Sequence, residues 1–171
     1  MADKQATKVY SDKQEKLVAS ILNGNVVPGS GSRPTVPGDV KSENWLAECK
    51  THVEPGHNIF FDLNVWKKIS DEAMALHRLP VLVVDDGSQK ERHTWCLCRS
   101  CNIYKGNLMI VPFPVTVRKN ISCKEDKLNE ALSQAKKWLG GLYIGACFEF
   151  SWNEEDICIL PITTFKEVYD K

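Results

Sequence analysis

The chain has no hydrophobic run that approaches the roughly 18 residues needed for a membrane-spanning helix. Its first ten residues, MADKQATKVY, are polar and contain no apolar stretch followed by a cleavage site of small residues. No secretory signal is therefore predicted. We expect a cytoplasmic protein with no membrane partner, in the host cytoplasm if a phage encodes it.

An excess of charge of one sign is also missing. Lys+Arg and Asp+Glu both number 22, so the chain has no overall field that would attract a polyanion. This balance argues against a protein that coats nucleic acid in bulk. It is compatible with a nuclease, because an acidic metal site offsets basic residues elsewhere and the bound cation restores positive charge locally.

A pair of C-x2-C motifs, as zinc knuckles require, is absent as well. The 7 cysteines are an odd number in a chain without an export signal, which predicts reduced thiols. His93, Cys96, Cys98 and Cys101 offer soft ligands, so structural Zn²⁺ at these four residues is one interpretation. The other, which we favour, is a buried strand, because the two central cysteines alternate with apolar residues and free cysteine behaves as a small apolar side chain.

What is present is typical of one globular domain over residues 1–171. Hydrophobic residues make up 43% and charged residues 26% of the chain, and its length suits a single core. Hydrophobic spacing and turn residues predict an α/β protein with a central mixed sheet flanked by helices. The predicted helices cover residues 11–22, 62–77, 124–139 and 163–169, and the predicted strands lie in a hairpin over 38–52 and at 81–84, 94–98, 108–113, 142–152 and 157–160.

The predicted hairpin carries three charged residues that point to metal chemistry. Side chains alternate across a strand, so Glu48 and Lys50 emerge on one face. Asp39 lies on the preceding strand, close enough to share a cation with Glu48. Mg²⁺ usually binds one or two protein carboxylates and keeps several waters, and Lys50 would orient an attacking water. The alternative is an ion pair on the surface of an edge hairpin.

The order Pro37-Gly38-Asp39 followed by Glu48-Cys49-Lys50 resembles the motif of the PD-(D/E)xK nuclease superfamily. Glu15 matches the acidic residue that many members place on a helix before this core, or it is an ordinary solvated glutamate of a first helical turn. Two further segments are similar to archaeal and phage Holliday-junction resolvases. One is the loop 29–33, and the other is the helix that ends before Pro80 together with the apolar strand that follows it. The resemblance covers about residues 11–85, with Gly38 in place of the motif's proline, and leaves residues 86–171 unassigned.

The resemblance implies a restriction-endonuclease-like core, a homodimer and Mg²⁺-dependent cleavage of branched or duplex DNA, with Mn²⁺ able to substitute. It also implies catalytic roles for Asp39, Glu48, Lys50 and Glu15. The implied metal ligands are Asp39, Glu48, Glu15 and the backbone carbonyl of Cys49. A Holliday-junction-resolvase-like endonuclease is the leading expectation. A sequence-specific homing or restriction-type endonuclease and a non-catalytic DNA-binding protein on a nuclease fold are the alternatives.

Two further segments are candidates for contact with DNA. Ser30, Ser32 and Arg33 lie in a glycine-rich loop whose hydroxyls, guanidinium and amides suit a phosphate, although a simple connector explains the same composition. Lys67 and Lys68 lie on the predicted helix 62–77, where they either contact the DNA backbone or form its solvent-exposed face.

Overall fold

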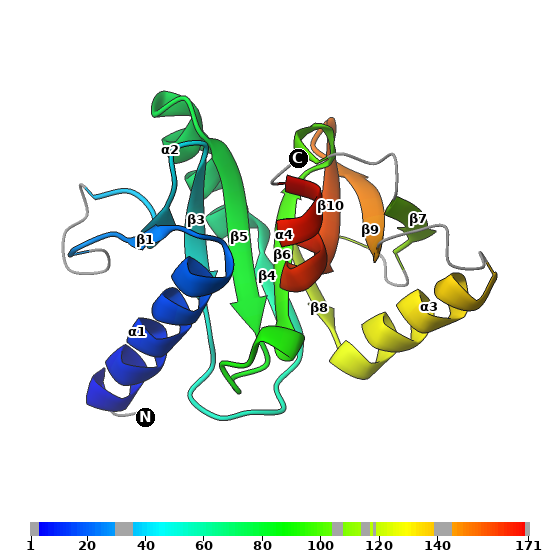
Figure 1. The fold of residues 1–171 in the computed structure, drawn as a ribbon, viewed down its shortest axis with the longest axis horizontal. Coiled ribbons are helices and arrows are strands. Elements are labelled where there is room, and N and C mark those ends of the chain that lie inside the picture. The colour runs from blue at the N-terminus through cyan, green and yellow to red at the C-terminus, as the bar shows by residue number, and fades with distance from the viewer. Residues whose placement is uncertain are drawn as a thin grey trace.

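The computed structural model describes residues 4–29, 36–103, 108–113, 117, 119–138 and 145–169. Its centre is an eight-stranded mixed sheet in the order β1-β2-β3-β5-β6-β10-β9-β7, and β4 and β8 form a separate two-stranded sheet (Figure 1). The predicted α/β fold, with a central mixed sheet and flanking helices, is confirmed. The parallel pairs are β3 with β5 and β7 with β9, and the other described strand pairs are antiparallel.

The elements have the following bounds. The helices are α1 (Lys4–Ile21), α2 (Leu63–Ala75), α3 (Glu125–Trp138) and α4 (Ile162–Tyr169), with short 3-10 helices η1 (Glu91–His93) and η2 (Ser100–Asn102). The strands are β1 (Asn25–Val26), β2 (Val40–Lys41), β3 (Trp45–Lys50), β4 (Ile59–Asp62), β5 (Leu79–Asp85), β6 (Thr94–Arg99), β7 (Leu108–Pro112), β8 (Asn120–Cys123), β9 (Gly145–Trp152) and β10 (Glu155–Pro161).

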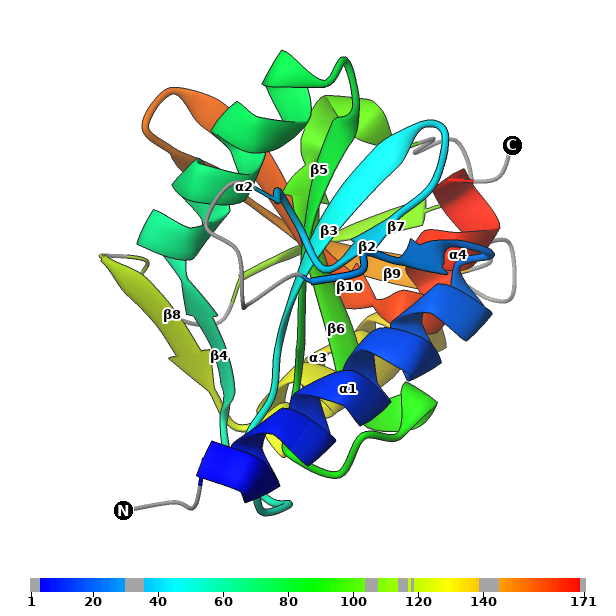
Figure 2. The ribbon, with the colours of Figure 1, turned by 90° about the vertical axis from the view of Figure 1, so that its left-hand side faces the viewer.

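Each face of the sheet supports its own hydrophobic core. The α1-side core lies under α1 and α4 and includes Ala47, Val83 and Phe165. The α2-side core lies under α2, α3 and the β4–β8 pair and includes Leu46, Leu82 and Trp66. In Figure 2, α1 and α4 lie on one side of the sheet, and α2 and the β4–β8 pair lie on the other side. Alternation along β3 and β5 sends successive side chains into the two cores.

The hairpin that carries the candidate site is formed as expected. Val40 pairs with Ala47 and Lys41 with Leu46, and the turn at residues 42–44 is closed by a hydrogen bond from Ser42 N to Trp45 O (3.0 Å). β3 then runs parallel to β5, as the buried run at 81–84 indicated. The carboxyl ends of β3 and β5 therefore lie side by side at one end of the sheet.

Other predicted elements differ from the structure mainly at their ends. The first helix begins by Lys4, so the predicted start at Ser11 is wrong, while its end is followed by Asn23 in the left-handed conformation (φ 51°), as predicted. Strands β1, β4 and β8 were not predicted, because runs of 2–4 residues carry little periodicity.

The side-chain environment of the cysteines and tryptophans fits the expected packing. All 7 cysteines are free of disulfides, and only Cys101 is exposed. Trp45, Trp66 and Trp95 are core residues. No helix in the described residues is long and apolar enough to cross a bilayer.

Candidate active site

Asp39 is fixed at the edge of β3 by the backbone around it. Its backbone N donates to Ala47 O (2.8 Å), and its Oδ2 accepts a hydrogen bond from Cys49 N (2.9 Å). The preceding Gly38 has φ +66°, a conformation that glycine adopts without a steric penalty. The carboxylate, on a residue only 8% exposed, is therefore held beside the peptide bond that joins Glu48 to Cys49.

Glu48 and Lys50 form an ion pair at the carboxyl end of β3. Lys50 Nζ lies 2.6 Å from Glu48 Oε1; the side chain of Glu48 is 10% exposed and that of Lys50 is 51% exposed. Burial lowers the pKa of Lys50, but the hydrogen bond and charge of Glu48 and the charge of Asp39 outweigh it and raise that pKa overall. The amine is therefore held protonated, and it lies within the field of both acids.

Helix α1 brings a third carboxylate to this end of β3. Gln14, which is 1% exposed, donates from Nε2 to Lys50 O (2.8 Å) and so attaches the helix to the strand. The pKa of the neighbouring Glu15 is raised to about 7. Burial is the largest cause, followed by the negative charges of Asp39, Asp12 and Glu48, while Lys50 opposes them. Glu15 therefore shares one electrostatic environment with the hairpin residues.

The arrangement suits a hard cation. The Lys50 amine contacts Glu48, and Asp39 and Glu15 lie within electrostatic range of this pair. A divalent ion would offset the negative charge that, together with burial, raises the pKa of Glu15. The Cys49 thiol does not contribute, because the side chain packs in the α1-side core and burial raises its pKa. The three acids do not converge closely enough to form a preassembled cage, so water and substrate oxygens would complete the shell, as Mg²⁺ prefers.

A second group of acidic and imidazole side chains lies elsewhere. Within the described residues, one group of three or more His, Cys, Asp or Glu side chains has donor atoms that all lie within 4.8 Å of one another. It consists of Asp86, His93 and Glu125. None of these residues was predicted as a ligand except His93, which was considered with the cysteines.

Comparison with known proteins does not name the site. No protein family, curated protein or solved structure was found to match this chain. The case for a function therefore depends on the residues themselves and on the chemistry that their arrangement allows.

The four donor atoms of the alternative zinc site do not lie together, and the favoured interpretation of a buried strand agrees with the structure. Cys96 and Cys98 are buried in the α1-side core, and Cys101 is exposed in η2. His93 is directed instead to Glu125, with 2.7 Å between Nδ1 and Oε2. These four residues belong to the described part of the chain and do not gather their donor atoms there, because alternation along β6 sends its cysteines into the core.

Of the candidate DNA-contact residues, the structure describes Lys67 and Lys68. Lys67 and Lys68 lie on the exposed face of α2, opposite its buried stripe, and Lys68 pairs with Glu72 one turn further on (3.6 Å). Both lysines therefore belong to the solvent-exposed face of α2, where a phosphate could reach their side chains. Ser30, Ser32 and Arg33 lie outside the described residues.

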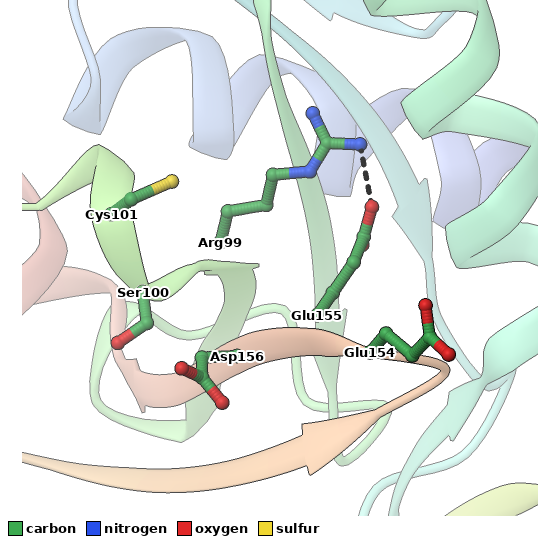
Figure 3. A pocket seen from close by; sticks show the side chains of 6 residues that line it. All are labelled: Arg99, Ser100, Cys101, Glu154, Glu155 and Asp156. Atoms are coloured by element: carbon green, nitrogen blue, oxygen red, sulfur yellow. Dashed lines mark hydrogen bonds and ion pairs between the residues drawn. The ribbon is translucent and has the colours of Figure 1, made fainter.

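A hollow at the opposite end of the sheet does not resemble a phosphate site. It is lined by Arg99, Ser100, Cys101, Glu154, Glu155 and Asp156 (Figure 3). Arg99 is already paired with Glu155 (3.0 Å), so the remaining charges are negative and would repel a polyanion. β6 is antiparallel to β5, which places this hollow away from the carboxyl ends of β3 and β5.

Sequence reasoning missed two features of this end of the molecule. Gln14 was overlooked, although a polar residue four positions before Val18 interrupts the buried stripe of α1 and indicates a partner. The grouping of Asp86, His93 and Glu125 joins segments that are far apart in the chain, and no local spacing indicates it.

Proposed function

We propose that this protein is a divalent-metal-dependent endonuclease that hydrolyses DNA phosphodiester bonds, with a four-way junction as the leading substrate. The observation that carries the proposal is the clustering of Asp39, Glu48 and Lys50 at the carboxyl end of β3, with Glu15 of α1 in their electric field. Burial and the charges of Asp39, Asp12 and Glu48 together raise the pKa of Glu15 to about 7. Shifted pKa values of this kind are frequent at functional sites.

Each residue has a role that its position allows. Asp39, held by the Cys49 backbone amide, and Glu48 supply carboxylate oxygens to the cation, with Glu15 and the Cys49 carbonyl as further ligands. When bound, Mg²⁺ or Mn²⁺ polarises the scissile phosphate and acidifies a water. Lys50, half exposed and protonated, orients that water and stabilises negative charge that develops at phosphorus.

The raised pKa of Glu15 adds a pH dependence. A protonated Glu15 binds a cation poorly, and its carboxyl group loses its proton around pH 7. Cation affinity is therefore expected to increase as the pH rises from 6 to 8. Lys50 remains charged across this range because its pKa is raised.

The test is cleavage of matched four-way, flap and linear DNAs in Mg²⁺, Mn²⁺ or EDTA. Asp39→Asn, Glu48→Gln and Lys50→Ala should each lower the cleavage rate by roughly 10²-fold or more, with the fold retained by circular dichroism. Glu43→Gln and Lys41→Ala change exposed residues of the same hairpin and should cleave like the parent.

The substrate profile separates the rival functions. Symmetric paired cuts in the four-way DNA support a resolvase, and cuts at one sequence in linear DNA support a homing or restriction-type enzyme. Binding of DNA without cleavage in either metal would favour the non-catalytic alternative. Cleavage that survives both Asp39→Asn and Lys50→Ala would refute the site.

A further inference from the structure

The second cluster, Asp86, His93 and Glu125, has the composition of a metal site that is separate from the proposed nuclease centre. Asp86 follows β5, His93 ends η1, and Glu125 begins α3. One donor atom from each lies within 4.8 Å of the other two. Zinc ligands about 2.0–2.2 Å from the ion are roughly 3.3 Å apart. The 2.7 Å between His93 Nδ1 and Glu125 Oε2 must therefore widen, and the other donor spacings, which are at most 4.8 Å, must contract by no more than about 1.5 Å.

The Glu125 carboxylate is also oriented by a partner on its other side. Glu125 Oε1 accepts a hydrogen bond from Trp95 Nε1 (3.2 Å), which leaves Oε2 directed to His93 Nδ1. Such outer contacts are the kind that fix metal ligands and choose the coordinating atom. His93 Nε2 accepts from the exposed Arg92 Nε (2.9 Å), a contact that ligation through Nδ1 would break.

The Asp86 carboxylate is held in the same way. Oδ1 accepts from Ser88 N (2.9 Å) and Oδ2 from Gly56 N (3.4 Å), and His57 N donates to Asp86 O (3.0 Å). Asp86 is therefore a nearly buried carboxylate with its position already set.

We propose that Asp86, His93 and Glu125 bind a divalent cation of the zinc class. One imidazole nitrogen and two carboxylate oxygens form a three-ligand set that suits Zn²⁺, whereas Mg²⁺ favours oxygen alone. In the ion-free protein, a proton on Nδ1 bridges His93 and Glu125. When the cation takes Nδ1, the ring proton is carried on Nε2 instead, so the imidazole stays neutral and the exposed Arg92 side chain gives up its contact with Nε2. Water completes the coordination shell.

The cation would link three segments at the end of the sheet. The loop 51–58 is attached to Asp86, η1 contributes His93, and α3 contributes Glu125. α3 otherwise contacts mainly β7 and β9, near the other edge of the sheet. The ion would thereby fasten the start of α3 to the carboxyl end of β5, and its role is structural.

The experiment is a titration of chelator-stripped protein with Zn²⁺ in a reducing buffer, followed by isothermal calorimetry and thermal denaturation. We expect one equivalent to bind and to raise Tm by roughly 4 °C or more at saturation. His93→Ala and Glu125→Gln should lose both effects. Glu125→Gln preserves the shape of the side chain and the acceptor for Trp95, so it tests the site even if His93→Ala folds poorly.

Matched controls separate this site from the others. His77→Asn and Glu130→Gln alter exposed residues, the latter on the same helix as Glu125, and should bind Zn²⁺ like the parent. Cys101→Ser removes the exposed thiol and should also leave binding intact. Binding that persists in Glu125→Gln, or is lost in Cys101→Ser, would overturn the proposal, as would no binding at all. An Asp39→Asn variant should retain the Zn²⁺ effect even where DNA cleavage fails.

Discussion

Glu15 is an acid of the candidate active site whose ionisation is altered by burial and by neighbouring charges. Its pKa rises from 4.5 to about 7 in the folded chain. Below pH 4.5 the carboxyl group is protonated in both the folded and unfolded states, so there is no penalty. As the pH rises from 4.5 to 7, the unfolded state ionises first and the folded state loses relative stability. The loss is well below the roughly 3 kcal/mol that the full pKa difference implies, because solvent screens the partly exposed carboxyl group.

Glu15→Gln should therefore stabilise the metal-free protein at pH 8 and have little effect at pH 4. We expect a gain of about 1 kcal/mol at the higher pH, because solvent screens the partly exposed carboxylate and reduces the full effect; urea denaturation in EDTA measures it. Glu43→Gln, at an exposed position, is the control. A stability difference that does not change between the two pH values would show that the pKa of Glu15 is not raised in the folded protein.

Gly38 controls the position of Asp39. A Cβ at Gly38 would lie 2.7 Å from Leu46 side-chain atoms and 3.1 Å from Ala47 O, at a φ of +66° that other residues rarely adopt. Gly38→Ala should therefore shift the backbone that holds Asp39, lower stability by about 1–3 kcal/mol and greatly reduce cleavage. Gly56 also has a positive φ, but an added Cβ there would have no neighbour within 4 Å. Gly56→Ala is therefore a control that introduces backbone strain without a clash that displaces Asp39. Equal loss of activity in both variants would contradict this explanation.

At the scale of the element, α2 depends on its first residue. Asp62 lies just before the helix and its Oδ1 accepts a hydrogen bond from Asn64 N (2.8 Å). Asp62→Ala should cost about 1 kcal/mol, while Asp62→Asn retains an acceptor and should cost much less. Chemical denaturation measures both. If Asn destabilises as much as Ala, the capping hydrogen bond is not what Asp62 contributes.

The elements that sequence predicts well are those whose burial repeats over several turns or residues. The stripe of α2, with Trp66, Ile69 and Ala73, and the continuous apolar run of β5 are both of this kind. β4 shows the limit. Ile59 and Phe61 are buried and Phe60 is exposed, but this alternation lasts four residues and runs directly into α2, so it gives no separate signal.

The residues of the candidate site also differ in how far local sequence patterns predict their positions. Asp39, Glu48 and Lys50 belong to one hairpin, so strand alternation and a nearby turn predict their proximity. The approach of Glu15 depends on how α1 packs across the sheet, which the resemblance to PD-(D/E)xK nucleases suggested and the residues alone did not. The meeting of His93 with Glu125 depends on the path of α3 over the other face, which no short-range pattern contains.

At the scale of the whole molecule, the two cores are joined through shared strands. β5 is buried on both faces: Leu82 packs in the α2-side core and Val83 in the α1-side core. Neither core can lose its sheet face without exposing the other, because six strands contribute residues to both cores, namely β3, β5, β6, β7, β9 and β10. We therefore expect the two faces to unfold as one unit.

Two leucine truncations on opposite faces test this coupling. Leu82 and Leu160 are both 0% exposed, the first in the α2-side core and the second in the α1-side core. Replacing either with Ala leaves a cavity and should cost about 2–5 kcal/mol. Because the sheet is shared, each variant should shift one common transition, with far-ultraviolet circular dichroism and tryptophan fluorescence changing together. Two separated transitions, only one of which responds to each variant, would mean that the faces are independent and that the carboxyl end of β3 can stay folded after the opposite core is lost.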